Sequence, residues 1–594
     1  MIKKLLMLFI AVQQIATAQV LTSDRRTDWS LAGFQDTLPV YSQVLNITAY
    51  GAVGDATTVN DTAIVKAIAA LNGHSGIIYF PTGNFLFNQS IILPDSVVLK
   101  GNSADSTRLS FDLGGVNSLI VMKGTEGPTV ARFQANASKD STSITVDDAS
   151  AIHVGDYIRI SQNDTALVAS SWAYGTVGQI VKVRSINNNT LSLYSPLRKN
   201  FTTSDSTKVS ILSPRVGCGL ECLTIKRLDA SASETHNIEM TIAAKCWLKG
   251  IISDTCNFMH VSINTGANIE ITGCYFHDAY AYGPSHGMGI ALSYTSGECL
   301  IENNVFNHLR HAMLIEAGAS GNVFGYNSST NPYGQDTLAG FPLPTASSAD
   351  MLLQGNYPFL NLFEGNTGQN ITIDNSSGIN GPYNTYFRNR AALYGIYMGA
   401  NPSSDSQNIV GNEVPNTGFS MGLYTLNGNG EFTYANNIQG TIKPTGTSTL
   451  TDTSYYKKAR PLFFTTADAW PGIGAPNVPG QGTIPAQRRQ QQSLFADCST
   501  YYPVIDTTSG IRDPHSDLAV AIYPNPTKGL VHIRYNGNGY LTVHISDMSG
   551  HDIMQRQIHS DEEIDISTLS DGLFLIHLYE GNNWIKSDKL LVIK

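Results

Sequence analysis

Side chains that can transfer protons gather between residues 277 and 311. Asp278 and His308 have the same separation in the chain as the starts of two similar segments, Cys274 and Asn304. If these segments stack in adjacent turns of a repeating fold, the carboxylate lies beside the imidazole, raises the pKa of the histidine and orients its ring. A surface hydrogen bond without a catalytic role is the alternative. The candidate catalytic residues are Asp278, His286, His308, Arg310 and His311.

Aromatic and charged side chains are suited to holding a sugar near these residues. Aromatic rings stack on the apolar faces of sugars, and guanidinium groups pair with carboxylates. Two of the candidates have structural alternatives, since Asp350 could cap the strand after it and Arg388 could form an ion pair with Glu364. The candidate substrate-binding residues are Tyr280, Tyr282, Asp350, Arg388 and Arg390.

A regular repeat indicates the elements that must position these side chains. Four similar segments follow one another at a constant spacing, beginning at Asn361, Thr385, Ile409 and Thr433. A constant spacing of this size is typical of one coil of a β-solenoid, in which equivalent positions stack about 4.8 Å apart. The spacing therefore predicts one inward-pointing column of Leu362, Tyr386, Val410 and Tyr434, and a second column of Glu364, Arg388, Asn412 and Asn436.

The coil that contains the candidate catalytic residues is longer than this repeat. Its extra length predicts that it expels a loop, over residues 279–297. The loop would carry Tyr280, Tyr282 and His286 to the wall of a groove along one face of the coil.

Three further regions have other patterns. Residues 128–214 contain short alternating apolar runs separated by polar turns, which predict a small antiparallel β-barrel or sandwich inserted after the first coils. Residues 440–497 contain apolar and aromatic segments, so we expect this extension to pack on the outside of the coil. A linker is expected at 498–517, before a last β-rich segment at 518–594.

Residues 48–101 resemble the N-terminal segment of the pectate lyase superfamily. The resemblance rests on Thr48-Ala-Tyr-Gly-Ala-Val-Gly-Asp55, on Asn60-Asp-Thr-Ala63 at the start of a helical pattern, and on the strand and turn Gly76-Ile-Ile-Tyr-Phe-Pro81. It implies an all-β protein whose main domain is a right-handed parallel β-helix, with the cap and first coils at 44–127 and the later coils and extension at 215–497. The family includes polysaccharide lyases and glycoside hydrolases, so the resemblance implies an extracellular polysaccharide as partner.

Residues 518–594 resemble the C-terminal sorting domain of type IX secretion substrates. The matching segments are Tyr523-Pro-Asn-Pro-Thr-Lys-Gly529, Asp571-Gly-Leu-Phe574 and Lys589-Leu-Leu-Val-Ile-Lys594. The resemblance implies an immunoglobulin-like β-sandwich that outer-membrane export machinery recognises, and a chain that is secreted or attached to the cell surface. A plain adhesion module is the alternative. Lys3, Lys4 and the apolar run after them predict a signal peptide at 1–18, so the route crosses the periplasm.

Two reactions fit the implied family. β-Elimination on a uronic acid polymer needs a group that neutralises the C6 carboxylate, for which Arg310, Arg388 and Arg390 are available, and a base for the C5 proton, for which the histidines or a tyrosinate are available. Hydrolysis needs two carboxylates that flank the bond. The acids of the coil are Asp278, Asp350, Glu364 and Asp374. Of the four motifs of polygalacturonase-like hydrolases, the coil echoes only Gly-His-Gly, at Ser285-His286-Gly287. We favour a lyase, with a hydrolase or a non-catalytic glycan-binding surface protein as alternatives.

Composition narrows the partners and cofactors. The chain has 37 basic and 47 acidic residues and a formal net charge of −10, which argues against nucleic acid as a partner. The seven cysteines leave at least one unpaired. Cys218 and Cys222 could form a small disulfide loop or half of a metal site, but no partner pair has a zinc-like spacing, so no metal site is expected. No cofactor is expected, although Ca²⁺ could replace an arginine in a lyase.

Overall fold

The computed structural model describes residues 19–35, 41, 43–283, 285–333, 337–338, 341–342, 349–418, 421–465, 468–475, 477, 480–498, 520–523, 527–535, 540–547, 552–559, 562–580 and 583–594. The chain divides into two compact units, Met1–Tyr501 and Tyr502–Lys594. The predicted signal peptide and nearly all of the predicted linker lie outside the described residues. Among the helices that are described, none has the length and apolar character needed to cross a membrane.

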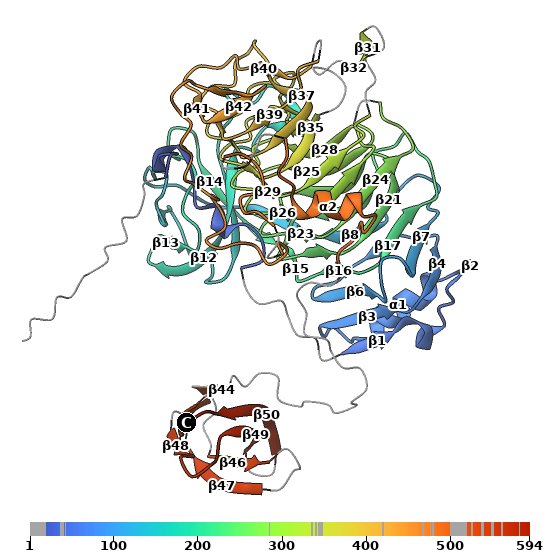
Figure 1. Ribbon diagram of the computed structural model, residues 1–594, viewed down its shortest axis with the longest axis vertical. Coiled ribbons are helices and arrows are strands. Elements are labelled where there is room, and N and C mark those ends of the chain that lie inside the picture. Colours follow the sequence, from blue (N-terminus) through green and yellow to red (C-terminus); the bar gives the residue numbers. More distant parts are fainter. Residues whose placement is uncertain are drawn as a thin grey trace, which may run out of the picture. The chain divides into compact units, whose positions relative to one another are not determined.

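The first unit is built on a right-handed parallel β-helix, as the resemblance implied (Figure 1). One strand of each coil joins a parallel sheet of twelve strands, here called ladder 1. In spatial order its strands are β1 (Val44–Asn46), β3 (Gly76–Phe80), β6 (Val97–Gly101), β16 (Gly219–Glu221), β20 (Trp247–Lys249), β23 (Glu270–Thr272), β26 (Leu300–Glu302), β29 (Val323–Gly325), β34 (Leu362–Glu364), β36 (Thr385–Phe387), β38 (Asn408–Val410) and β41 (Phe432–Tyr434).

The other coil strands form a sheet of 21 strands that comprises two parallel ladders. Ladder 2 follows ladder 1 in each coil and contains β2 (Asp55–Val59), β4 (Gly83–Phe87), β7 (Thr107–Phe111), β17 (Thr224–Arg227), β21 (Ile252–Cys256), β24 (Tyr275–Ala279), β27 (Val305–Asn307), β30 (Ser328–Thr330), β35 (Thr367–Ile373), β37 (Arg390–Met398), β39 (Glu413–Val414) and β42 (Asn436–Ile438), with β43 (Thr441–Lys443) antiparallel at its end. Ladder 3 contains β5 (Ile91–Ile92), β8 (Ile120–Lys123), β18 (His236–Thr241), β22 (Met259–Asn264), β25 (Met288–Ser293), β28 (His311–Ile315), β33 (Ala349–Leu353), the second halves of β35 and β37, and β40 (Leu423–Thr425).

Short elements complete the coil. Helix α1 contributes Ala63, Ile64 and Ala67 to the core at the N-terminal end, as expected of a cap. These elements are α1 (Asp61–Ala70), α2 (Pro485–Gln491), the strand pairs β15 (Arg215–Val216) with β19 (Ala243–Ala244) and β31 (Thr337–Leu338) with β32 (Phe341–Pro342), and the 3₁₀ turns Ser23–Arg25, Trp29–Leu31, Ile47–Tyr50 and Ser171–Ala173.

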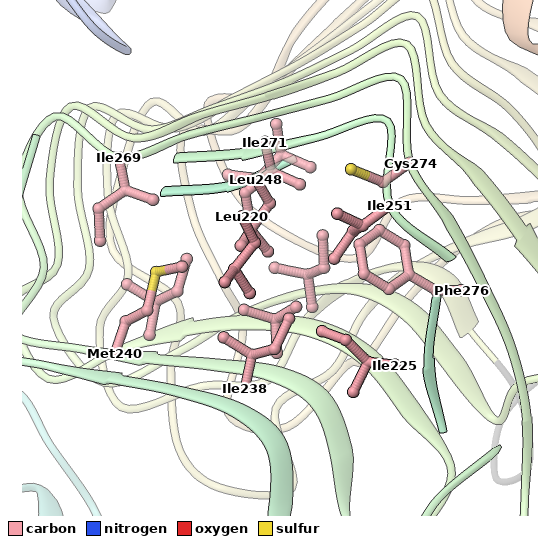
Figure 2. Packing of buried hydrophobic residues seen from close by; sticks show 14 of the residues in the cluster. Leu220, Ile225, Ile238, Met240, Leu248, Ile251, Ile269, Ile271, Cys274 and Phe276 are labelled. Carbon is pink, nitrogen blue, oxygen red and sulfur yellow. The ribbon is translucent and has the colours of Figure 1, made fainter. Parts of the chain in front are cut away.

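The core runs inside the coil as stacked apolar side chains. Figure 2 shows Leu220, Leu248 and Ile271, which are register partners in ladder 1, with side chains from the other ladders around them. All three are fully buried. Because each coil repeats the same inward positions, burial of apolar side chains in one coil stabilises the stacking of the next.

The predicted inward column is wrong by one position. Leu362 pairs with Thr385, and Phe363 pairs with Tyr386, because the coils that begin at Leu362 and Thr385 are each one position shorter than the predicted period. Side chains alternate between the two faces of a strand, so a shift of one position exchanges inside for outside. The true inward column contains Phe324, Phe363, Tyr386 and Ile409, and the rings of Phe363 and Tyr386 stack with centroids 4.9 Å apart.

One residue per coil between ladders 1 and 2 adopts a left-handed backbone conformation. The column includes Gly250 (φ 57°), Tyr326 (φ 54°), Gly365 (φ 67°) and Arg388 (φ 54°). A buried asparagine follows it in the later coils, and each side-chain amide donates to the next side-chain carbonyl at 2.9 to 3.1 Å. This ladder satisfies backbone groups that the turn leaves unpaired. Its members are Asn304, Asn327, Asn366, Asn389, Asn412 and Asn436.

A separate antiparallel sheet is inserted between β8 and β15. Its six strands are, in spatial order, β10 (Ser143–Thr145), β13 (Thr190–Leu193), β12 (Gly178–Asn187), β11 (Tyr157–Ser161), β14 (Lys208–Ser213) and β9 (Thr125–Arg132). Its apolar core is its own. The buried Arg198 attaches it to the coil, because its Nη1 lies 2.8 Å from Glu298 Oε1 and its Nε donates to Ser320 Oγ at 2.9 Å.

Segments from both ends of the first unit pack on the outside of the coil. Trp29 is buried and its Nε1 donates to the carbonyl of Leu360 at 2.7 Å. The extension after β43 forms a second apolar cluster with outward residues of ladder 1. Phe495, near its end, stacks on Tyr275 of ladder 2 with ring centroids 4.4 Å apart.

The second unit contains two antiparallel sheets around one apolar core. Val531, Val543 and Ile576 contribute to this core from different strands. One sheet has the order β44 (Val520–Tyr523), β45 (Leu530–Tyr535), β48 (Glu562–Asp565), and the other β47 (Asp552–Ile558), β46 (Leu541–Ser546), β49 (Gly572–Glu580), β50 (Asn583–Val592).

Candidate functional site

The outer face of ladder 2 carries a row of polar side chains from successive coils. Register places Lys226, Asp254, His277, Asn307 and Thr330 in this row. Lys226 Nζ lies 2.7 Å from Asp254 Oδ2. Burial would raise the pKa of Asp254, but hydrogen bonds from Lys226 and from its neighbouring threonine lower it overall. The row therefore presents an ionised carboxylate next to an ammonium group.

In each coil the chain turns between ladders 2 and 3. One residue of this turn has a left-handed backbone conformation in successive coils, among them Asp278 (φ 61°) and His308 (φ 53°). Asp278 Oδ1 lies 2.9 Å from His308 Nδ1, and its Oδ2 lies 2.9 Å from His277 Nδ1. The expected contact between Asp278 and His308 therefore exists. Burial would raise the pKa of Asp278, but the hydrogen bonds and charges of the two histidines lower it overall. Asp278 thus stays ionised and orients both imidazoles.

Tyr282 completes the surroundings of His308. Its hydroxyl oxygen lies 3.1 Å from His308 Nδ1 and accepts a hydrogen bond from the amide of Ala279 at 3.0 Å. Its ring stacks on Tyr333 with centroids 4.1 Å apart. An ionised carboxylate can only accept hydrogen bonds, so Nδ1 of His308 must be the protonated nitrogen that donates to Asp278. In the neutral ring the lone pair is then on Nε2. No described residue hydrogen-bonds to Nε2, and the His308 side chain is 43% exposed.

Burial sets the protonation state of the groups behind this surface. It raises the pKa of Tyr282 to about 12, so the hydroxyl keeps its proton at neutral pH. It lowers the pKa of His260 to about 3, so this ring is neutral. His260 bridges the Ser253 hydroxyl at 2.8 Å and the carbonyl of Asp278 at 3.1 Å, and so supports the left-handed turn from below. Sequence reasoning missed Lys226 and Asp254, whose ladder 2 positions the later repeats could have indicated. It also missed His260, which lies in β22 of ladder 3.

The loop between β24 and β25 is shorter than predicted. Residues 288–293 form β25 of ladder 3, because Ile290 and Leu292 point into the core, so the expelled loop covers only 280–287. Arg310 Nη1 donates to the carbonyl of Gly283 at 2.9 Å and so contacts this loop. The rings of His286 and Phe258 pack together with their centroids 4.2 Å apart.

Two further candidates, Tyr280 and His311, hydrogen-bond to residues outside the group formed by Asp278, His308 and Tyr282. The Tyr280 hydroxyl donates to the Arg227 carbonyl at 3.1 Å, with the residue 42% exposed. His311 is buried, and its Nδ1 accepts from the amide of Ala349 at 3.2 Å. Burial and the charge of Arg310 lower the pKa of His311 to about 3, so this histidine is not a suitable base at the surface.

The remaining candidates lie in buried structural networks. Asp350 accepts from the Ser329 hydroxyl at 2.6 Å, and burial raises its pKa. Arg388 does not pair with Glu364 as expected. Its guanidinium donates to carbonyls of the extension, namely those of Leu450, Asp452, Ile473 and Ala475. Arg390 Nε binds Glu413 at 2.8 Å.

A cavity of about 580 Å³ lies over ladder 1, between the N-terminal segment and the extension. Two carboxylates from adjacent coils line it. Burial and the charge of Glu302 raise the pKa of Glu270. Glu302 in turn lies 3.0 Å from Lys457 Nζ and accepts from the Tyr456 hydroxyl at 3.0 Å. Sequence reasoning did not identify this cavity, because its walls come from segments far apart in the chain.

Among the described side chains, no group of three or more His, Cys, Asp or Glu residues is arranged to hold a metal ion.

Comparison with known families assigns two parts of the chain. Residues 44–213 match the family described as rhamnogalacturonase A/epimerase, pectate lyase-like, and residues 521–594 match the secretion system C-terminal sorting domain. The first coils and the inserted sheet are thus similar to the pectate lyase-like family, and the second unit is similar to secretion sorting domains. The sorting domain implies handling by the type IX secretion system, so the β-helix is exported and is secreted or attached to the cell surface.

Solved structures with a similar fold include the tailspike protein gp49 of Pseudomonas phage LKA1, at 14% identity over 62% of this chain and 64% of that chain, with a TM-score of 0.49. The chain therefore spans less than two thirds of that tailspike. The A-module of mannuronan C-5 epimerase AlgE4 of Azotobacter vinelandii has 12% identity over 66% and 96% of the chains and a TM-score of 0.31. An exopolygalacturonase of Thermotoga maritima has 10% identity over 64% and 82%, also at 0.31. No curated protein matches the sequence.

Proposed function

We propose that the protein cleaves an extracellular polysaccharide that contains uronic acid, by β-elimination on the outer face of ladder 2. The observation that carries this proposal is the group formed by Asp278, His308 and Tyr282. Asp278 holds the proton of His308 on Nδ1, so Nε2 of this partly exposed ring is the nitrogen left to act as the base. The match to the pectate lyase-like family supports a glycan as the substrate.

The three side chains supply the parts of an elimination. His308 Nε2 accepts the C5 proton of the uronic acid, and the C4–O4 bond then breaks as the C4=C5 double bond forms. The Tyr282 hydroxyl, which accepts from the Ala279 amide and lies beside His308 Nδ1, keeps its own proton available for the leaving O4. Lys226 in the polar row and Arg310 after His308 are the cationic candidates for neutralising the C6 carboxylate.

The protonation states favour elimination over hydrolysis at this face. A hydrolase needs one carboxylic acid whose pKa is raised so that it can donate a proton. The two carboxylates of the face, Asp254 and Asp278, both have lowered pKa values. They therefore act as ionised partners of cations and imidazoles rather than as general acids.

A panel assay tests the proposal. The purified secreted chain is incubated with polymers of mannuronate, guluronate, galacturonate and glucuronate, and with neutral glycans, with and without added calcium. Ultraviolet absorbance of an unsaturated product, lost in His308→Ala, supports the proposal. New reducing ends without this absorbance, or retention on a glycan without cleavage, contradict it.

One observation favours hydrolysis as a second candidate function. Glu270 and Glu302 both line the cavity over ladder 1, and burial and the charge of Glu302 raise the pKa of Glu270, as a general acid requires. Since Glu302 is already bound by Lys457 and Tyr456, we rank this candidate second. Reducing ends that disappear in Glu270→Gln and persist in His308→Ala would support it.

A further inference from the structure

The end of the extension meets the coil at a pair of cysteines. Cys222 belongs to the left-handed column after ladder 1, and Cys498 is the last residue described before the second unit. The Cys222 thiol donates to the backbone carbonyl of Cys498 at 4.0 Å and interacts with the Cys498 thiol, although the residues are 276 positions apart in the chain. The contact therefore joins the coil to the far end of the first unit.

The fold makes room for this contact with a glycine. Cys222 and Gly250 follow the paired residues Glu221 and Lys249, so they are neighbours in adjacent coils. A Cβ at Gly250 would lie 2.6 Å from the carbonyl oxygen of Asp497 and 3.0 Å from Cys498 Sγ. The amide of Asp497 donates to the carbonyl of Gly273 in the next coil at 2.7 Å. The chain is thus fixed on two successive glycines with its last thiol next to Cys222.

We infer that Cys222 and Cys498 form a disulfide in the exported protein, which fastens the extension to the β-helix. Both thiols lose their protons, one S–S bond forms, and the two electrons reduce a disulfide of the oxidant, either a periplasmic thiol–disulfide oxidoreductase or oxidised glutathione, to two thiols. Export through the periplasm provides the oxidising compartment. Cys498 is exposed, and the hydrogen bond from Cys222 lowers its pKa, so it is the attacking thiolate.

A second pair of cysteines provides an internal comparison. Cys218 and Cys246 occupy adjacent coils and are also in contact, but both are completely buried in the core. An oxidant cannot reach them in the folded protein, and an inward disulfide would displace the packed column. The inference therefore specifies one disulfide, with the other five cysteines reduced: Cys218, Cys246, Cys256, Cys274 and Cys299.

The test counts thiols in the full secreted chain. Alkylation in denaturant without reductant should label five cysteines, and after reduction all seven, and peptide mapping should recover Cys222 linked to Cys498. Seven labelled thiols before reduction, or a disulfide between any other two cysteines, overturn the inference.

Single and double variants test the function of the bond. Cys222→Ser, Cys498→Ser and the double variant should show the same increase in cleavage of the extension by a dilute protease, because each removes the same bond. Reductant should reproduce this increase in the parent and change nothing in the variants. Additive effects of the two substitutions, or an unchanged parent after reduction, would show that the thiols act separately.

Discussion

Asp278 Oδ1 and His308 Nδ1 lie 2.9 Å apart although the two residues belong to successive coils of the chain. Each residue has a left-handed backbone conformation and directly follows one of the paired ladder 2 residues His277 and Asn307, so stacking of these coils brings them together. Non-glycine residues adopt this conformation at a cost, which the surrounding structure must offset. Both side chains are partly exposed, at the face where the proposed reaction takes place.

Replacing the proposed base should remove cleavage. His308→Ala is expected to lower kcat by about 100-fold or more, because general base catalysis contributes roughly 10² to 10⁴ in rate. Steady-state kinetics on the best polymer of the panel measures the effect, and circular dichroism checks the fold. His153→Ala is the matched control, since His153 lies in the inserted sheet region with a side chain that is 78% exposed. Equal losses of kcat in both variants would show that His308 is not the base.

Removing one hydroxyl should separate proton donation from stacking. Tyr282→Phe keeps the ring contact with Tyr333 and is expected to lower kcat by roughly 10-fold or more while KM changes little, because only the proton donor is lost. Tyr333→Phe, on the other face of the same ring stack, should retain activity. If Tyr282→Phe retains full activity, the leaving oxygen receives its proton from another group.

The pH dependence of stability should reveal the buried carboxyl of Glu364. Burial raises its pKa from 4.5 to about 7. Between these values the unfolded chain has lost the proton that the folded chain keeps, so stability falls as the pH rises. Glu364→Gln should remove this term and gain roughly 3 kcal/mol relative to the parent between pH 4.5 and pH 8. Calorimetry of the β-helix transition at these two pH values measures it, and parallel curves for the two proteins would contradict the assignment.

Arg388 should prove structural rather than substrate-binding. Its guanidinium binds carbonyls of the extension, so Arg388→Ala leaves buried acceptors unpaired and should cost about 3 kcal/mol or more. Thermal unfolding measures the loss. At a temperature where the variant is folded, its KM for the polymer should equal that of the parent. A raised KM with unchanged stability would restore Arg388 to the substrate site.

The asparagine ladder should be a main support of the coil. Asn389 is buried and bonds to Asn366, Asn412 and the carbonyl of Phe363. Asn389→Ala should therefore lower the free energy of unfolding by about 3 kcal/mol, since several buried groups lose their partners. Asn331→Ala, at an exposed position, is the control.

The β-helix could be predicted from the sequence, because the length of each coil sets the spacing of its apolar pairs and asparagines. The sequence did not predict which residue of each coil points inward, because neighbouring coils differ in length by one position and such a shift reverses the faces. Asp278 and His308 were found together because their coil carries a recognisable repeat. Arg388 and Asp350 were expected at the substrate site, because nothing in their local sequence shows that Arg388 binds the extension or that Asp350 hydrogen-bonds to strands of adjacent coils.

The products of the preferred polymer test the central claim most directly. Elimination yields fragments with an unsaturated end that are lighter by one water molecule than the products of hydrolysis, and mass spectrometry distinguishes the two. The account predicts unsaturated fragments from the parent protein and none from His308→Ala. Saturated fragments from the parent, or unsaturated fragments that His308→Ala still produces at the parent rate, would contradict it.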